Sequence, residues 1–152
     1  MNSYRQGVVA VIQNDRGEIL LFERADSLGW QFPQGGVKQG ESPEQALMRE
    51  LEEETGTEKF KILRKGGGTT FYDWPRLTRQ TRFVGAEHTW FLCKFIGAGA
   101  PNLANTDGTF SQFRWERPEA ALAAIVEFKR LPFRKGLQML GLVGGPSETG
   151  IS

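Results

Sequence analysis

Three glutamates near the middle of the chain have the spacing of residues that share one face of a helix. Glu50, Glu53 and Glu54 stand at positions i, i+3 and i+4, which project from the same side of an α-helix. Their like charges repel one another unless a cation lies among them, and Mg²⁺ prefers carboxylate oxygens as ligands. Arg49, beside Glu50, carries a planar guanidinium that can orient a carboxylate or hold a phosphate. These four residues together predict a divalent-metal site.

The residues that would position those glutamates are the boundary signals of the helix. Ser42 is placed to cap its start, Pro43 fits the first helical position, and Gln45 completes a capping box. Gly56 is placed to end it. A glutamate-rich run by itself more often marks a solvated helix face. Here a glycine turn, the cap, an arginine and the carboxylate spacing occur together, which favours the metal site.

Residues 35–57 resemble the Nudix box. Its pattern is Gly, five residues, Glu, seven residues, Arg-Glu, an aliphatic, any residue, Glu-Glu, any residue, Gly and an aliphatic. The positions that match are Gly35, Glu41, Arg49, Glu50, Leu51, Glu53, Glu54 and Gly56. Thr57 replaces the final aliphatic, which affects packing more than chemistry. So many fixed positions make the resemblance specific. It implies the Nudix fold, an α+β protein built as an α/β/α sandwich with a mixed β-sheet flanked by helices.

The resemblance also implies a reaction. Nudix enzymes hydrolyse a nucleoside diphosphate linked to a further group, with Mg²⁺ or Mn²⁺ balancing the charge. Metal ions held by carboxylates reduce the repulsion between an anion and its nucleophile and lower the pKa of the attacking water. The implied metal ligands are Glu50, Glu53, Glu54 and the backbone carbonyl of Gly35. The implied catalytic residues are Glu53, Glu50 and Arg49, with Arg49 orienting Glu50 and one glutamate acting as the base.

The segment that leads into the box resembles one branch of the family. Trp30-Gln31-Phe32-Pro33-Gln34-Gly35-Gly36 is similar to the corresponding segment of bacterial RNA pyrophosphohydrolases. Three further segments fit that branch, and these are Tyr4-Arg5, Tyr72-Asp73-Trp74-Pro75 and Val126-Glu127-Phe128-Lys129-Arg130. The resemblance implies conversion of 5′-triphosphate RNA ends to 5′-monophosphates with release of pyrophosphate, the step that initiates mRNA decay.

The same branch implies five substrate-binding residues. Arg24 and Phe128 occupy the places of an arginine and a phenylalanine that flank an RNA base, and Lys129 would hold a phosphate. Tyr72 and Arg5 complete the set. Stacking between a guanidinium and a ring needs no hydrogen bonds to base edges, so it tolerates different RNA sequences. The alternative is that Phe128 belongs to the core and that Lys129 is ordinary surface charge.

Two positions depart from the pattern of that branch. Relatives carry another glutamate shortly before a late aromatic-Arg-Trp motif, whereas Thr109 stands near that place in this chain. Asp107 is the candidate replacement, and the alternative is a metal position that is lost or filled by water. Glu127 stands where relatives usually have a small hydroxyl residue. Its charge would repel RNA phosphate and alter substrate preference.

Other functions share the same motif. The closest is hydrolysis of dinucleoside polyphosphates such as diadenosine tetraphosphate or pentaphosphate, and another is pyrophosphohydrolysis of nucleoside or deoxynucleoside triphosphates. A module that binds polyphosphates without chemistry is the alternative from a different class. The intact Glu50, Glu53 and Glu54 weigh against it, because a pure binder has no use for a metal-activated water.

Composition places limits on partners. The 152 residues suit one domain, 1–152, with a frayed tail from about residue 144. The net charge of +1 attracts neither nucleic acid nor membranes in bulk, so any RNA contact needs a local patch. The expected partners are 5′-triphosphorylated RNA or a nucleoside polyphosphate, with no role for DNA or a membrane, in a cytoplasmic monomer or homodimer. The lone Cys93 and the lone His88 exclude a cysteine cluster and a histidine-rich zinc site.

Periodicity and turn residues predict the remaining elements. The apolar runs 7–13 and 18–23, joined by a turn at 14–17, predict an opening hairpin. Further strands are expected at 60–63, 89–96 and 110–116, and helices at 118–126 and 131–142. Gly66-Gly67-Gly68 predicts a loop or bulge. The aromatic and basic segment 69–83 suits either an RNA-binding surface or a hairpin with core aromatics and solvated arginines.

Overall fold

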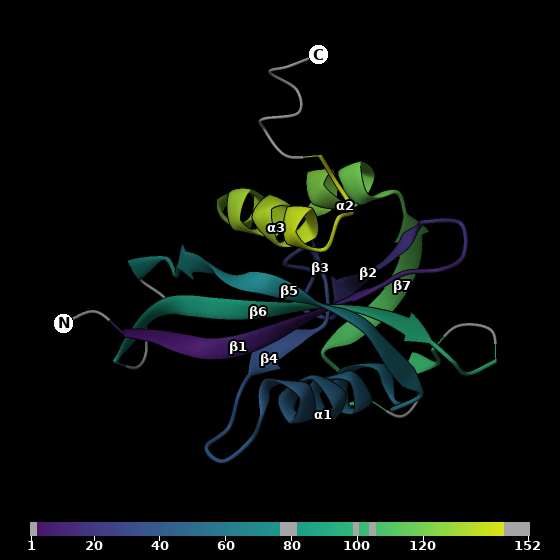
Figure 1. Cartoon of the computed structure of the whole chain (residues 1–152), viewed down its shortest axis with the longest axis horizontal. Coiled ribbons are helices and arrows are strands. Elements are labelled where there is room, and N and C mark those ends of the chain that lie inside the picture. Colours follow the sequence, from purple (N-terminus) through teal and green to yellow (C-terminus); the bar gives the residue numbers. More distant parts are fainter. Residues whose placement is uncertain (1–2, 77–81, 99–100, 104–105, 145–152) are drawn as a thin grey trace.

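The computed structural model describes residues 3–76, 82–98, 101–103 and 106–144. Two sheets lie between helices, with α1 (Pro43–Thr55) on one side and α2 (Pro118–Ala124) and α3 (Glu127–Met139) on the other (Figure 1). The strands are β1 (Ser3–Ile12), β2 (Ile19–Arg24), β3 (Trp30–Gln31), β4 (Gln34–Gly36), β5 (Phe60–Asp73), β6 (Phe83–Phe95) and β7 (Phe110–Glu116). The predicted α/β/α sandwich is confirmed. Most of the predicted tail lies outside the described residues.

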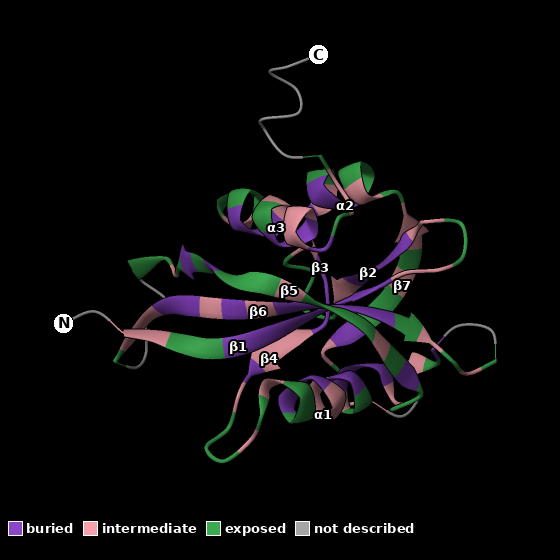
Figure 2. Ribbon diagram, in the orientation of Figure 1, coloured by how far each residue is buried: buried purple, intermediate pink, exposed green. Residues whose placement is uncertain are grey.

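Strand β1 is the centre of the larger sheet, whose order is β4-β1-β6-β5. It runs parallel to β6 and antiparallel to β4. Val9 and Val11 enter the core beneath α2 and α3, while Val8, Ala10 and Ile12 enter the core against α1. Figure 2 shows β1 and β6 as buried over much of their length. A strand covered on both faces has no polar alternation, which explains the continuous apolar run in the sequence.

The predicted opening hairpin is wrong. The turn after β1 forms, but β2 belongs to a second sheet of order β3-β2-β7. The two strands share only the isolated bridge between Gln13 and Ile19 among the described residues. An apolar strand can pair with any strand that leaves both of its faces covered. Its pairing partner is therefore determined by residues far away in the chain.

Helix α1 has the ends that its sequence predicts. The Ser42 side chain accepts a hydrogen bond from the backbone N–H of Gln45, whose own side chain accepts from Ser42, and Pro43 occupies the first turn. Gly56 ends the helix with a φ of 79°, a left-handed conformation that glycine adopts without strain. The carboxylates of the helix therefore project from a rigid, well-terminated element.

Strands β5 and β6 form a hairpin that is much longer than the sequence predicts. Strand β5 continues through the three glycines to Asp73, and its pairing shifts between Lys65 and Thr69, so the predicted irregularity is a bulge inside a strand. Tyr72 is buried in the core, as the hairpin alternative requires, whereas Phe71 is exposed. Part of segment 69–83, including Arg79, lies outside the described residues.

The last helix begins four residues earlier than predicted. Helix α3 starts at Glu127, with no side-chain cap at Val126 and with Pro132 inside it. An uncapped start leaves no sequence signal, and an internal proline normally marks a first turn. As a consequence, Phe128 and Lys129 lie in the first turn of α3 instead of in the loop before it.

Candidate active site

Arg49 connects the catalytic helix to the glycine turn. Its guanidinium donates to both carboxylate oxygens of Glu41 at 2.7 and 2.9 Å and to the carbonyl of Gly36 at 2.9 Å. The same side chain donates to Glu50 Oε1 at 2.8 Å and lies 3.5 Å from Glu53 Oε1. A planar fork that uses several donors at once is well suited to fixing geometry. The structure thus places Arg49 where it orients Glu50.

Glu50 and Glu54 are carboxylates held in an unfavourable environment. Glu54 is 4% exposed and accepts the backbone N–H of Gln34 at 3.0 Å. Burial, followed by the charge of Glu50, raises the pKa of Glu54 to about 9. Burial also raises the pKa of Glu50, in spite of the Arg49 hydrogen bond. A buried and a partly buried carboxyl that repel each other gain charge stability from a cation placed between them.

Gly35 closes this site from the opposite side. A Cβ on Gly35 would lie 2.1 Å from Glu50 Cδ and 2.2 Å from Glu50 Oε1. Only a residue without a side chain lets the Glu50 carboxylate lie against the backbone of β4. Strand β4 and helix α1 therefore hold the Glu50 carboxylate against the backbone of Gly35. Carboxylate and backbone oxygens are the donors that hard divalent cations prefer.

The acidic groups do not form a closed cage on their own. In the part of the chain that the structure describes, no three Asp, Glu, His or Cys side chains converge closely enough to enclose an ion. Arg49 lies among the glutamates, and each of the three accepts a hydrogen bond from a described residue through Oε1, at 2.8 Å for Glu50, 3.0 Å for Glu54 and 3.5 Å for Glu53. Their second oxygens remain available. This donor set fits an open site that water or substrate completes, as is usual for Mg²⁺.

Asp107 reaches the same region from the loop before β7. Its backbone N–H donates to the carbonyl of Glu53 at 2.8 Å, which ties the loop to α1. Its Oδ1 accepts the N–H of Thr109 at 2.9 Å. The charge of Asp107 contributes to the raised pKa of both Glu50 and Glu54. The tertiary structure thus brings the carboxylate of Asp107 toward α1. Thr109, which stands near the position where the resemblance implies a glutamate, has no carboxylate.

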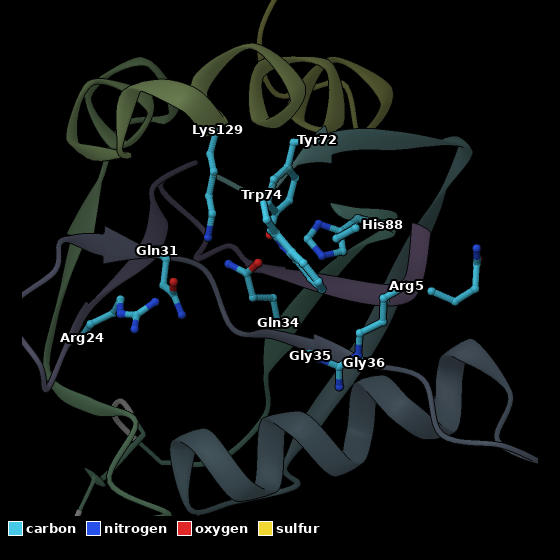
Figure 3. Close-up of a pocket in the computed structure, with 13 residues that line it drawn as sticks. Arg5, Arg24, Gln31, Gln34, Gly35, Gly36, Tyr72, Trp74, His88 and Lys129 are labelled. Atoms are coloured by element: carbon cyan, nitrogen blue, oxygen red, sulfur yellow. The ribbon is translucent and has the colours of Figure 1, made fainter. Parts of the chain in front are cut away.

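A polar pocket of about 200 Å³ begins at the glycine turn and contains most of the predicted substrate residues. Figure 3 shows its lining, in which side chains from β1, β5, β6 and the start of α3 converge over β4. The predicted residues among them are Arg5, Arg24, Gly35, Tyr72 and Lys129. A Cβ on Gly36 would lie 2.2 Å from Arg5 Nη2, so the second glycine of the turn makes room for this arginine.

A larger, mainly apolar pocket of about 560 Å³ adjoins the first. Arg24 and Phe128 both line it, together with Trp30, Trp74 and Val126. Arg24 is oriented by Asp26, whose carboxylate accepts from Nε at 3.0 and 3.2 Å. The Phe128 ring is 45% exposed, which answers the alternative that it is a core residue.

Lys129 lies where the two pockets meet. Its Nζ is 5.2 Å from the centroid of the Tyr72 ring and 5.8 Å from that of Phe128, within the range of cation–π attraction. Burial, and secondarily the charge of Arg24, lowers the pKa of Lys129 to about 8. It is therefore not an ordinary surface lysine.

Several residues that line the polar pocket are not among the predicted site residues, although Gln31, Gln34 and Trp74 lie in segments that resemble bacterial RNA pyrophosphohydrolases. Gln31, Gln34, Trp74 and His88 line the polar pocket. From the sequence, His88 is evidence only against a histidine-rich zinc site. The sequence shows only that a single histidine stands at the start of an apolar strand. That His88 lies next to Gly7 of β1 becomes known only from the structure.

Comparison with known proteins identifies the family. A model of the NUDIX domain matches residues 3–136, so the chain belongs to the Nudix family. Nudix hydrolases generally use divalent metal ions. The predicted family and enzyme class are confirmed.

Individual relatives show which members of the family this chain resembles in sequence. The RNA pyrophosphohydrolase of Rhodospirillum rubrum is 41% identical over 133 residues, which cover 84% of this chain and 81% of that protein. The RNA pyrophosphohydrolase of Ectopseudomonas mendocina is 37% identical over 147 residues, with 91% and 92% covered.

Solved structures share the fold at lower identity. The E. coli dihydroneopterin triphosphate pyrophosphohydrolase superposes with a TM-score of 0.66 at 20% identity, covering 88% of this chain and 97% of that one. The C. elegans Ap4A hydrolase superposes with a TM-score of 0.63 at 19% identity, covering 91% and 97%. Among the described residues, no helix is both long and apolar enough to cross a membrane.

Proposed function

We propose that this protein hydrolyses 5′-triphosphate RNA ends to 5′-monophosphates, releasing pyrophosphate and initiating mRNA decay. The observation that carries the proposal is the continuity of the two pockets, which share Arg24, Gln31, Trp74 and Lys129. A phosphate chain in the polar pocket would leave its first bases beside the apolar one. The relatives named RNA pyrophosphohydrolase support the same substrate.

We propose Mg²⁺ or Mn²⁺ as the metal, bound by carboxylates of Glu50, Glu53 and Glu54 and by the carbonyl of Gly35. The metal supplies charge neutralisation at the phosphoanhydride and lowers the pKa of a bound water. Asp107 is the additional carboxylate on this side of the pocket, replacing the glutamate that relatives carry near Thr109. Arg49 keeps Glu50 in place through its bond to Oε1.

We assign Glu53 as the general base. Its side chain is 42% exposed, and the Arg49 nitrogen closest to it is 3.5 Å away. The other two glutamates of the motif accept shorter hydrogen bonds through Oε1, at 2.8 Å for Glu50 and 3.0 Å for Glu54. Glu53 is thus the carboxylate most free to accept a proton from an attacking water. The polar pocket, which reaches Gly35 at this site, holds the phosphates through Arg5 and Lys129.

A comparison of substrates tests the proposal directly. Rates would be measured with Mg²⁺ on triphosphorylated RNA, diadenosine tetraphosphate and dGTP at equal concentrations. We expect the highest kcat/KM on RNA, with 5′-monophosphorylated RNA and pyrophosphate as products. Faster release of ATP from diadenosine tetraphosphate would assign the chain to dinucleoside polyphosphates instead, and faster turnover of dGTP would assign it to the nucleotide pool.

Replacing Phe128 should affect RNA selectively. In Phe128→Ala we expect kcat/KM on triphosphorylated RNA to fall about tenfold, because base–aromatic stacking contributes about 1–3 kcal/mol per base. Turnover of dGTP should change less than twofold. Leu131→Ala is the matched control, since Leu131 is also an exposed apolar residue of α3 but does not line the apolar pocket. Equal losses on RNA and dGTP would remove the stacking assignment.

The lowered pKa of Lys129 predicts a pH dependence. A lysine with a pKa of about 8 is mostly charged at pH 7 and mostly neutral at pH 9, so its attraction for phosphate is lost as the pH rises through 8. We expect the ratio of kcat/KM between wild type and Lys129→Gln to fall about tenfold from pH 7 to pH 9. Taking the ratio cancels the pH effect on water activation. A ratio near one at both pH values would show that Lys129 does not bind phosphate, and a constant ratio well above one would contradict only the lowered pKa.

The predictions of a single domain, of a monomer or homodimer, and of no role for DNA remain predictions. The family match over residues 3–136 is compatible with one domain.

A further inference from the structure

His88 lies on the wall that separates the polar pocket from the core. It stands in β6 between Gly7 of β1 and Thr70 of β5, and its side chain is almost completely buried. Its ring centroid is 5.3 Å from that of Tyr72 and 6.3 Å from that of Phe133. Figure 3 shows the ring between Arg5 on one side and Tyr72 and Trp74 on the other.

The imidazole has an unmet hydrogen-bonding requirement. Among buried side-chain nitrogens and oxygens of the described residues, Nδ1 of His88 is the atom without a partner. Burying a polar group without a partner costs free energy that an apolar residue at the same place would avoid. A histidine used only for packing gives no compensation for this cost. A ligand bound by the other ring nitrogen, Nε2, leaves Nδ1 without a partner but offsets this cost with a hydrogen bond of its own.

Gly7 lets the His88 ring and the carbonyl of Gly35 approach each other closely, and all three residues line the polar pocket. A Cβ on Gly7 would lie 2.9 Å from the carbonyl oxygen of Gly35, 2.9 Å from Cδ2 of His88 and 3.2 Å from Nε2. Even a Cβ would not fit at Gly7, so the edge of the ring that carries Cδ2 and Nε2 lies close to the Gly35 carbonyl. Because no acceptor faces Nδ1, we place the proton of the neutral ring on Nε2, which lies on the Gly7 side of the ring.

The surrounding charges indicate what would enter. Burial, followed by the charges of Lys129 and Arg5, lowers the pKa of His88 to about 3, so the ring is neutral at pH 7. A neutral imidazole offers one N–H donor. The side chains of Arg5 and Lys129 line the same pocket. A site with two cations and an N–H donor is suited to an anion with several acceptor oxygens, which is a phosphate chain.

We propose that His88 is a substrate-binding residue that donates Nε2–H to a non-bridging oxygen of the polyphosphate chain. The assignment rests on the proposed function for the identity of the natural substrate, but inorganic tripolyphosphate tests it separately. The interaction holds a phosphate beside the scissile bond and is present equally in the ground and transition states. Its loss therefore raises KM more than it lowers kcat.

Because His88 is the only histidine, its ring nitrogens give one unambiguous pair of resonances in ¹⁵N NMR of the protein without a histidine tag. We expect the protonated nitrogen to shift on addition of tripolyphosphate or triphosphorylated RNA without metal, and not on addition of the same RNA with a 5′-hydroxyl. Absence of a shift with tripolyphosphate and triphosphorylated RNA would overturn the assignment, whether or not RNA is hydrolysed. A shift with tripolyphosphate in a protein that does not hydrolyse RNA would support His88 and contradict only the proposed function.

Variants provide the second readout. In His88→Leu we expect KM for triphosphorylated RNA to rise about tenfold with kcat within twofold, while His88→Gln, which keeps a neutral N–H donor, restores KM to within threefold of wild type. Both should keep the wild-type circular dichroism spectrum. A purely structural role predicts that leucine, the better core residue, is tolerated and that glutamine is not. That result would also overturn the assignment.

Discussion

Glu53→Gln should lose nearly all turnover while the fold is retained. We expect kcat on triphosphorylated RNA to fall about a thousandfold, because the amide neither accepts the proton of the attacking water nor offers a charged oxygen to the metal. Stability should change little, since the side chain is 42% exposed and its ion pair with Arg49 is long, at 3.5 Å. Turnover would be measured together with the thermal unfolding midpoint.

Glu52→Gln is the matched control for that variant. Glu52 is the neighbouring glutamate of α1 and is exposed to solvent, away from the face shared by the motif glutamates. It should keep wild-type kcat and the same unfolding midpoint. If Glu53→Gln retained even a tenth of wild-type kcat, the base would have to be another residue and the metal site would need to be reassigned.

Gly35→Ala should show the second-largest effect. The new Cβ would occupy the place of the Glu50 carboxylate, 2.1 Å from its Cδ. Since that carboxylate is the end of a flexible side chain, it would move away without unfolding the protein, and its bond to Arg49 at 2.8 Å would break. Displacement of a catalytic group by about 1 Å costs roughly a hundredfold in rate. We expect that loss in kcat, together with weaker Mn²⁺ binding measured by electron paramagnetic resonance.

Gly67→Ala is the control for the glycine change. Gly67 lies in the bulge of β5, and a Cβ there would meet no atom within 4 Å. We expect both its kcat and its Mn²⁺ affinity to equal those of wild type. Normal kcat in Gly35→Ala would mean that the Glu50 carboxylate is not needed where the structure places it, against its assignment as a ligand.

The sequence by itself determined the local parts of the site. The capping box, the terminal glycine and the i, i+3, i+4 glutamates depend on hydrogen bonds and spacings within one helix, and the structure has them as predicted. The resemblance to the Nudix box also indicated the family correctly. The pairing of the strands was predicted less well. Strand β1 is apolar on both faces, and such an apolar run does not indicate which strands lie beside it.

Only the tertiary structure decided which distant residues share a pocket. Arg5 on β1, Tyr72 on β5, His88 on β6 and Lys129 on α3 meet because β1 lies parallel to β6 and because α3 begins at Glu127. Strand register and an uncapped helix start depend on long-range packing, which leaves no periodic trace in the chain. Asp107 is likewise held near α1 by a backbone hydrogen bond between its loop and the helix, and no local sequence pattern predicts that bond.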